Sequence, residues 1–196
     1  MFFDDYFKTG KVYHIAPVND LGKILSDGIK HDDKVTYEYK YYAFHCFIDS
    51  MKPAYIPSWV KRKDAIFATK NYRREPGFCS HSVVMALDVE PSKCWIANEN
   101  RANQIYEPFI LQGVDSLRDA GEYVKTQGRK LIEEYWETSL SFEENLRKRM
   151  DLKDGYDAEV LIFHDVRPED IEILYIVSDH RVMKFDEWKK VFCKKR

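Results

Sequence analysis

Cysteine is scarce in this sequence, and the placing of the few cysteines argues against two ways of holding a fold together. The chain of 196 residues has four cysteines, at positions 46, 79, 94 and 193, and no two of them form a CxxC pair. A zinc site or a disulfide framework needs cysteines at closer or recurring spacings. Isolated thiols are typical of proteins in a reducing compartment. We therefore expect a cytoplasmic protein without a metal site.

Long apolar runs and an excess of one charge are also missing. No apolar stretch approaches the roughly 20 residues that cross a membrane. The N-terminal segment MFFDDYFKTGK lacks the basic leader and apolar run of a secretory signal. The 31 basic and 33 acidic residues give a formal net charge of −2, which argues against a protein that coats duplex nucleic acid but leaves a local basic groove open. The composition predicts a soluble protein without a membrane partner.

The motifs of several large enzyme classes are absent too. The sequence contains no Walker loop, no GxGxxG, no HExxH and no GxSxG. The nucleotide-hydrolase, Rossmann, zincin and α/β-hydrolase classes therefore lose their usual support. Six histidines are scattered along the chain with no pair at a metal-ligand spacing. Any function must be sought in residues that the fold brings together.

Apolar sequence is nevertheless sufficient for a core, at 44% of the residues. Strand patterns occupy residues 11–16, 64–69, 82–89, 93–97, 157–166 and 171–178. We expect a helix after the first strand that ends at Gly28, and a helical block from about 114 to 150 with a break near 138–141. Within that block, Tyr135 and Trp136 are expected to pack against the sheet. Strict alternation of strands and helices is missing, so we predict one α+β domain over residues 1–196 with a helical insertion around 114–150.

Three further segments are polar or irregular. Residues 31–43 predict a loop or an irregular extended stretch, and Pro53 and Pro57 allow only a short helix within 44–61. Residues 72–74 join a tyrosine to two arginines, a composition that holds single-stranded nucleic acid by stacking and phosphate contact. A solvated turn would have the same composition.

Two polar residues stand inside apolar strand patterns. His14 lies in the first strand, immediately before the helix that Gly28 ends. Glu159 lies in the segment DAEVLIF and shares a strand face with Leu161 and Phe163. Glu159 either marks the solvent-exposed start of an edge strand or is a carboxylate held in a cleft, which is a frequent catalytic arrangement.

The same two segments carry a resemblance to a known family. The string from Tyr13 to Leu21 (YHIAPVNDL), continuing to Ile24, Leu25, Gly28 and Ile29, resembles the opening of DarT-type ADP-ribosyltransferases. The string AEVLI at 158–162, followed by Val166, Pro168 and Ile171, is similar to the glutamate strand of that family. The two matches occur in the family's order, with the strand AIFAT at 65–69 between them, and span about a third of the chain.

The resemblance implies a split, mixed β-sheet of the ADP-ribosyltransferase type and NAD as a substrate. It assigns catalysis to Glu159 and to Arg62, the counterpart of an arginine before the middle strand. It places NAD against residues of the opening and middle segments, namely His14, Ile15, Asn19, Leu21, Phe67 and Tyr72. The acceptor would be a macromolecule, possibly a base of single-stranded DNA or RNA, and a toxin of this kind has an antitoxin or hydrolase counterpart.

The sequence departs from the family at two positions. Pro17 replaces a second histidine of the opening, and Phe67 replaces the tyrosine of the middle strand. Phe67 can stack on nicotinamide but cannot donate a phenolic hydrogen bond. These departures leave open a non-catalytic module that binds a nucleotide or nucleic acid. Removal of a phosphate from RNA with NAD is a third alternative, but the set of basic residues that it needs is not recognisable.

Overall fold

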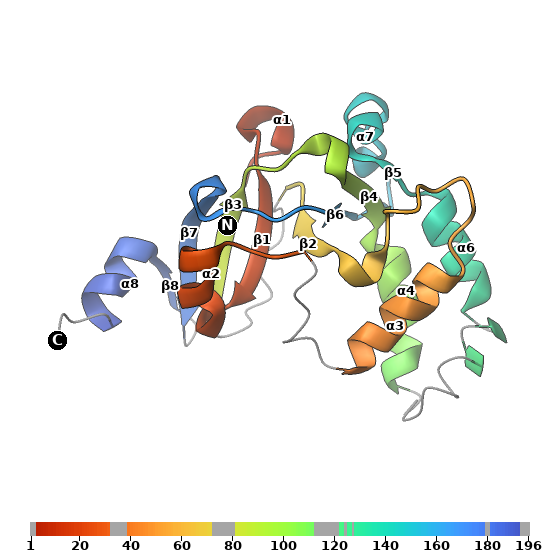
Figure 1. Cartoon of the computed structure of the whole chain (residues 1–196), viewed down its shortest axis with the longest axis horizontal. Coiled ribbons are helices and arrows are strands. Elements are labelled where there is room, and N and C mark those ends of the chain that lie inside the picture. Colours follow the sequence, from red (N-terminus) through yellow and green to blue (C-terminus); the bar gives the residue numbers. More distant parts are fainter. Residues whose placement is uncertain are drawn as a thin grey trace. The chain divides into compact units, whose positions relative to one another are not determined.

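The computed structural model describes residues 3–31, 39–71, 81–111, 122–123, 125–126, 128–178 and 181–192. Within these ranges the chain forms eight β-strands and seven α-helices (Figure 1), which agrees with the predicted α+β composition. The chain divides into two compact units, and each is described by itself. The first unit comprises Met1–Lys30, Phe67–Glu90 and His164–Arg196, and the second comprises His31–Ile66 and Pro91–Phe163.

A five-stranded sheet forms the first unit. Its strands, in sheet order, are β2 (Ile66–Thr69, of which Ile66 belongs to the second unit), β1 (Val12–Pro17), β3 (Ser82–Leu87), β7 (Ile171–Ser178) and β8 (Arg181–Lys184). All six residues of β3 are buried, as expected for the central strand of a sheet that is covered on both faces. β1 and β3 pair antiparallel from Val12 opposite Leu87 to Pro17 opposite Ser82. This pairing fixes the position of His14 beside Met85.

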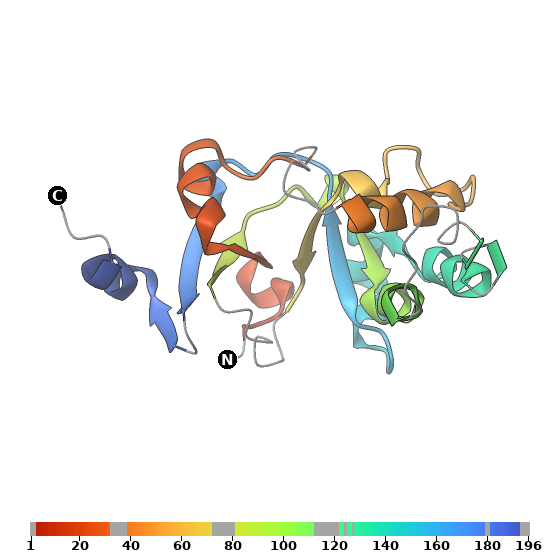
Figure 2. The same ribbon diagram turned by 90° about the horizontal axis from the view of Figure 1, so that it is seen from below.

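Short helices accompany this sheet. They are α1 (Tyr6–Thr9), the 3₁₀ turn η1 (Val18–Asp20), α2 (Leu21–Asp27), the 3₁₀ turn η5 (Pro168–Asp170) and α8 (Phe185–Phe192). The strand, short helix and glycine predicted for residues 11–28 are all present. Figure 2 shows α8 following β8, at the edge of this sheet. None of the helices in the described ranges has the length and apolar composition that a membrane crossing needs.

Gly28 ends α2 at a position that only glycine fits. Its φ is +76°, a backbone conformation that L-residues rarely adopt. A Cβ atom there would lie 2.1 Å from the carbonyl oxygen of Val166. The close approach exists because the next residue, Ile29, exchanges two backbone hydrogen bonds with Val166, of 2.8 and 2.9 Å. Gly28 therefore allows the segment after α2 to pair with the chain before β7.

The second unit contains a three-stranded sheet covered by helices. Its strands, in sheet order, are β5 (Leu140–Ser141), β4 (Cys94–Asn98) and β6 (Ala158–Ile162). Its helical segments are α3 (Tyr39–Ser50), η2 (Arg62–Asp64), η3 (Pro91–Lys93), α4 (Glu99–Leu111), α6 (Arg129–Glu137), α7 (Phe142–Lys148) and η4 (Met150–Leu152). All residues of β4 and β6 are buried, and Ala97 lies opposite Glu159 in their antiparallel register.

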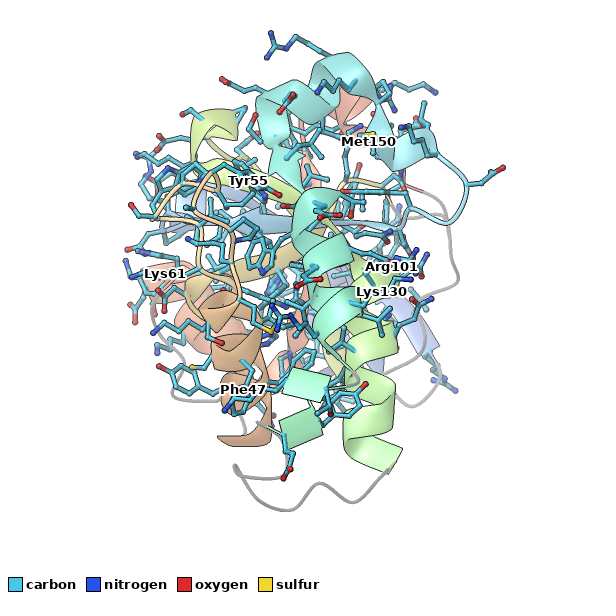
Figure 3. The ribbon with its side chains drawn as sticks, turned by 90° about the vertical axis from the view of Figure 1, so that its right-hand side faces the viewer. Phe47, Tyr55, Lys61, Arg101, Lys130 and Met150 are labelled. Carbon is cyan, nitrogen blue, oxygen red and sulfur yellow. The ribbon has the colours of Figure 1, made fainter. Side chains whose placement is uncertain are left out.

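Helix α6 packs on two neighbouring helices. It buries Ile132, Tyr135 and Trp136, whose spacing places them on one face. The indole nitrogen of Trp136 donates a 2.9 Å hydrogen bond to the carbonyl of Ile48 at the end of α3. Figure 3 shows α6 between α3 and α4. Tyr135 and Trp136 are thus core residues, and Tyr135 has a second role described below.

The structure corrects several expectations. Every strand pairing within the two units is antiparallel among the described residues, whereas a mixed sheet was predicted. The segment 31–43 is not wholly extended, because the 12-residue helix α3 begins at Tyr39 and ends before Pro53. Helix α4 was not predicted. The break near 138–141 is confirmed, since β5 separates α6 from α7, while residues 112–121 of the predicted helical block lie outside the described residues.

Candidate active site

The two residues predicted to catalyse form one ion pair in the second unit. Glu159 is the second residue of β6, and Arg62 is the first residue of η2, 97 positions earlier in the chain. A guanidinium nitrogen of Arg62, Nη1, contacts the carboxylate oxygen Oε1 of Glu159. Both residues are about 5% exposed. Glu159 is therefore not at the exposed start of an edge strand, because its side chain is enclosed within the second unit.

Two more buried side chains complete the cluster. The hydroxyl of Tyr135 accepts a 2.5 Å hydrogen bond from Arg62 Nη1 and donates a 2.8 Å hydrogen bond to Glu159 Oε1. The Nε of Arg62 donates to Nδ1 of His45, at 3.1 Å. The cluster thus draws one residue each from α3, η2, α6 and β6. We refer to His45, Arg62, Tyr135 and Glu159 as the buried cluster.

The backbone around Arg62 is fixed by Asp49, the next-to-last residue of α3. Its Oδ1 accepts a 2.7 Å hydrogen bond from the amide of Arg62, and its Oδ2 accepts a 3.0 Å bond from the amide of Lys63. The first amides of a helical turn have no partner within the turn, and an aspartate is well suited to accept from them. Burial raises the pKa of the Asp49 carboxyl, although the two amide bonds oppose the rise. The aspartate therefore sets the point from which the Arg62 side chain extends into the cluster.

The charges of the buried cluster follow from its contacts. Burial alone lowers the pKa of the Arg62 guanidinium, but the neighbouring Glu159 and Tyr135 more than compensate, and its pKa rises. Burial also raises the pKa of the Tyr135 phenol well above its ordinary value, against the lowering effect of Arg62. Arg62 is therefore a permanent cation and Tyr135 a neutral phenol at physiological pH. The single hydrogen of the phenol is donated to Glu159, since Arg62 is itself a donor.

The two oxygens of the Glu159 carboxylate are engaged differently. Both hydrogen bonds that the carboxylate accepts reach Oε1, and among the described residues none reaches Oε2. A carboxylate fixed through one oxygen keeps the other as an acceptor in a defined direction. Such an arrangement suits a fixed negative charge beside a developing cation, or a general base.

His14, the other candidate from the sequence, belongs to the first unit. Its Nδ1 lies 2.6 Å from the carbonyl oxygen of Phe67, on the neighbouring strand β2. A carbonyl can only accept, so Nδ1 carries the proton, and in a neutral ring Nε2 is the acceptor nitrogen. His14 and Phe67 are both half-buried. The structure thus brings together these two of the residues assigned to NAD.

The remaining residues assigned to NAD are placed less uniformly. Ile15 is exposed on the face of β1 opposite His14. Asn19 is exposed in η1, while the side chain of Leu21 is buried with Ile24 in the core of the first unit. Tyr72 lies outside the described residues. Two contacts thus join members of the predicted set, that of His14 with Phe67 in the first unit and that of Arg62 with Glu159 in the second.

Sequence reasoning missed the roles of Tyr135 and His45. Tyr135 was assigned to packing, and its burial bears that out, but nothing in the helical pattern shows that its hydroxyl meets a carboxylate. His45 is one of six histidines and carries no distinguishing neighbour pattern. Only the packing of α3 and α6 against β6 reveals them. Among the described residues, no three histidine, cysteine, aspartate or glutamate side chains are grouped so that they could hold a metal ion.

Comparison with known proteins adds no relative to this picture. No family model, no curated protein and no solved structure matches the chain. Support for a function therefore comes from the chemistry of the residues described above.

Proposed function

We propose that this protein is an NAD-dependent ADP-ribosyltransferase, in which Arg62 and Glu159 act in catalysis. One observation carries the proposal. The arginine and the glutamate to which the family resemblance assigns catalysis come from segments 97 positions apart, and they form one buried ion pair. The fold is proposed to be of the ADP-ribosyltransferase type on the same basis.

Three residues of the buried cluster would each have a defined task. In this reaction the bond between the ribose C1′ and nicotinamide breaks, its electron pair leaves with nicotinamide, and the acceptor forms the new bond to C1′. Glu159 would stabilise the positive charge that develops on the ribose, because a fixed anion is worth most in a site from which water is excluded. Its Oε2 would then take the proton that the acceptor loses. Arg62 and Tyr135 would hold the carboxylate through Oε1.

His14 would serve NAD through its ring. With Nδ1 held by the Phe67 carbonyl, the Nε2 of a neutral imidazole is an acceptor for a ribose hydroxyl. Phe67 would offer a ring for stacking. We propose a macromolecular acceptor, and the resemblance points to a base of single-stranded DNA or RNA as the candidate to test.

Replacement of Glu159 by glutamine tests the catalytic assignment. The variant keeps the size of the side chain but loses its charge, so transfer of labelled ADP-ribose from NAD should fall by about 100-fold or more. The assay offers single-stranded DNA, RNA and protein as separate acceptor pools. Glu137→Gln is the matched control, because Glu137 is exposed at the end of α6, and it should transfer at the wild-type rate. Undiminished labelling by Glu159→Gln, with circular dichroism unchanged, would falsify the assignment.

A second function is favoured by the burial of the same pair. Arg62 and Glu159 satisfy each other with only about 5% of either residue exposed, so the ion pair can also be a purely structural element of a non-catalytic nucleotide-binding module. The two functions differ in one measurable product. A module would be stabilised against heat by NAD without releasing nicotinamide, whereas a transferase would release nicotinamide in proportion to the acceptor added.

A further inference from the structure

The second unit contains a pocket that none of the predicted residues explains. Its volume is about 360 Å³, at the lower end of the range of small-molecule sites. It is lined by His31, Trp59, Lys61, Asp64, Ser92, Lys93 and Phe163. His31 precedes α3, while Trp59, Lys61 and Asp64 precede β2. Ser92 and Lys93 belong to η3, and Phe163 directly follows β6. Figure 3 labels Lys61 on this side of the unit.

Trp59 gives the pocket an aromatic wall. It is 43% exposed, although it is large and apolar. Its ring packs nearly perpendicular to Phe163, with centroids 5.3 Å apart, and to Trp95, with centroids 6.1 Å apart. Contacts of this geometry are favourable for aromatic pairs and fix the orientation of the ring. A partly exposed indole held in one orientation is a surface on which a planar ligand can stack.

The loop that carries Trp59 is itself held in place. The ammonium group of Lys52 donates hydrogen bonds to three backbone carbonyls, those of Pro57 at 2.8 Å, Ser58 at 3.3 Å and Val60 at 2.7 Å. Ser58 and Val60 are the two neighbours of Trp59 in the chain. One lysine therefore fixes the backbone on both sides of the indole. A site that is ordered before its ligand arrives loses less entropy on binding.

Charged groups surround the aromatic wall. Lys61 and Lys93 are exposed and supply two cations, and Asp64 supplies one carboxylate. The carbonyl of Lys93 accepts a 3.0 Å hydrogen bond from the amide of Phe163, so the lysine backbone is joined to the aromatic wall. Two ammonium groups match a phosphate, and a carboxylate is an acceptor for ribose hydroxyls.

A buried donor next to the wall lacks a partner. The indole nitrogen of Trp95 is enclosed and has no hydrogen-bond partner among the described residues. Trp95 is 7% exposed and packs against Trp59. A buried N–H without an acceptor is costly and uncommon in folded proteins. Trp95 does not itself line the pocket, and its contribution is the edge contact that helps to hold the Trp59 ring.

We propose that this pocket binds a nucleoside 5′-monophosphate. The base stacks on Trp59, Lys61 and Lys93 contact the phosphate, and Asp64 accepts a hydrogen bond from the ribose. A bare anion would not need the aromatic wall, and an uncharged aromatic ligand would not need the two lysines. The site goes beyond the proposed transferase function, because it shares no residue with the buried cluster or with the residues assigned to NAD. Its occupancy requires no glycosyl transfer.

Calorimetric titration of the full chain with AMP tests this site. We expect AMP to bind at least 10-fold more tightly than adenosine or inorganic phosphate, and its affinity to fall as salt is added because of the two lysine contacts. Trp59→Ala should weaken AMP binding by about 10-fold or more, the usual effect of removing a stacking ring. Trp59→Phe keeps a ring and should stay within about 5-fold of the wild type. Lys61→Ala combined with Lys93→Ala should abolish the preference for AMP over adenosine.

Matched controls come from the same unit. Tyr55→Ala removes an aromatic ring that is 68% exposed, and Lys130→Ala removes a lysine whose side chain is 86% exposed on α6; neither lines the pocket. Both should bind AMP like the wild type. Wild-type affinity for AMP in Trp59→Ala, or no binding of AMP at all, would overturn the proposal. Glu159→Gln should still bind AMP, so a failure of the transferase assay and a failure of this site remain distinguishable.

Discussion

The surroundings of His14 and those of Glu159 differ in what holds the functional group. In the first unit, His14 is oriented by a backbone carbonyl, that of Phe67, and the glycine after α2 is needed for backbone pairing. In the second unit, Glu159 is oriented by the side chains of Arg62 and Tyr135, which come from two other elements. The Phe67 carbonyl belongs to the backbone, so it is present whichever side chain residue 67 carries. A side-chain cluster depends on how distant segments pack, so the second site is the more sensitive to single side-chain changes.

Among the variants that test this comparison, Arg62→Met is expected to lower the free energy of unfolding the most. The substitution leaves the Glu159 carboxylate buried and without its cation, which costs about 3–5 kcal/mol of the free energy of unfolding. Urea denaturation followed by circular dichroism measures the loss. The double variant Arg62→Met with Glu159→Met leaves no charged pair in the buried cluster and should recover most of the stability. A double variant as unstable as the single one would show that packing, and not the charge, holds the cluster.

Gly28→Ala tests the backbone side of the comparison. The added Cβ would meet the Val166 carbonyl at 2.1 Å, at a residue whose φ is +76°, so we expect a loss of about 2–4 kcal/mol from clash and backbone strain together. Two other glycines separate these causes. Gly10 has a φ of +68° but open space around it, and Gly22 has open space without a positive φ.

The three alanine variants should therefore rank in a fixed order. Gly10→Ala should lose only about 1 kcal/mol, from strain alone. Gly22→Ala lies within α2 and should gain up to about 1 kcal/mol, since alanine is the better helix former. Urea denaturation of all three variants gives the ranking. Equal losses at Gly10 and Gly28 would mean that the approach of Val166 contributes nothing.

The same contrast explains which parts of the molecule the sequence could predict. β1, α2 and the Gly28 end were predictable because an apolar strand, a helical spacing and a glycine are adjacent in the chain. The start of helix α3, before residue 44, was missed because its tyrosine-rich sequence has weak helix propensity, which the packing of Phe44 and Ile48 into the core overrides. Helix α4 was missed because its described part buries only Ala102 and Ile105, too few for a clear apolar stripe.

The candidate site shows the same limit. Arg62 and Glu159 were each predicted from a resemblance in their own segments, but their contact joins positions 97 apart, and no local pattern encodes it. The helical spacing of apolar residues around Tyr135 predicts that its side chain is buried, but it does not predict what the hydroxyl contacts. What could be predicted was therefore the identity of the charged residues, while the hydrogen bonds that orient them required the packed helices.

The smallest expected effect concerns the Tyr135 hydroxyl and alkaline pH. In the folded chain, burial raises the pKa of this phenol well above its ordinary value near 10. Below about pH 10 the phenol is neutral in both states, and its contribution to stability is fully present. As pH rises further the unfolded chain loses the proton while the folded chain keeps it, so the free energy of unfolding falls by about 1.4 kcal/mol per pH unit.

The variant Tyr135→Phe tests this account. Its free energy of unfolding at pH 7 should be about 1–2 kcal/mol lower than that of the wild type, because the hydrogen bonds to Arg62 and Glu159 are lost. From pH 10 to 11 its stability should decline less steeply than that of the wild type. Urea denaturation at half-unit pH steps measures both slopes, and parallel curves for the two proteins would mean that the phenol is not held neutral by the buried cluster.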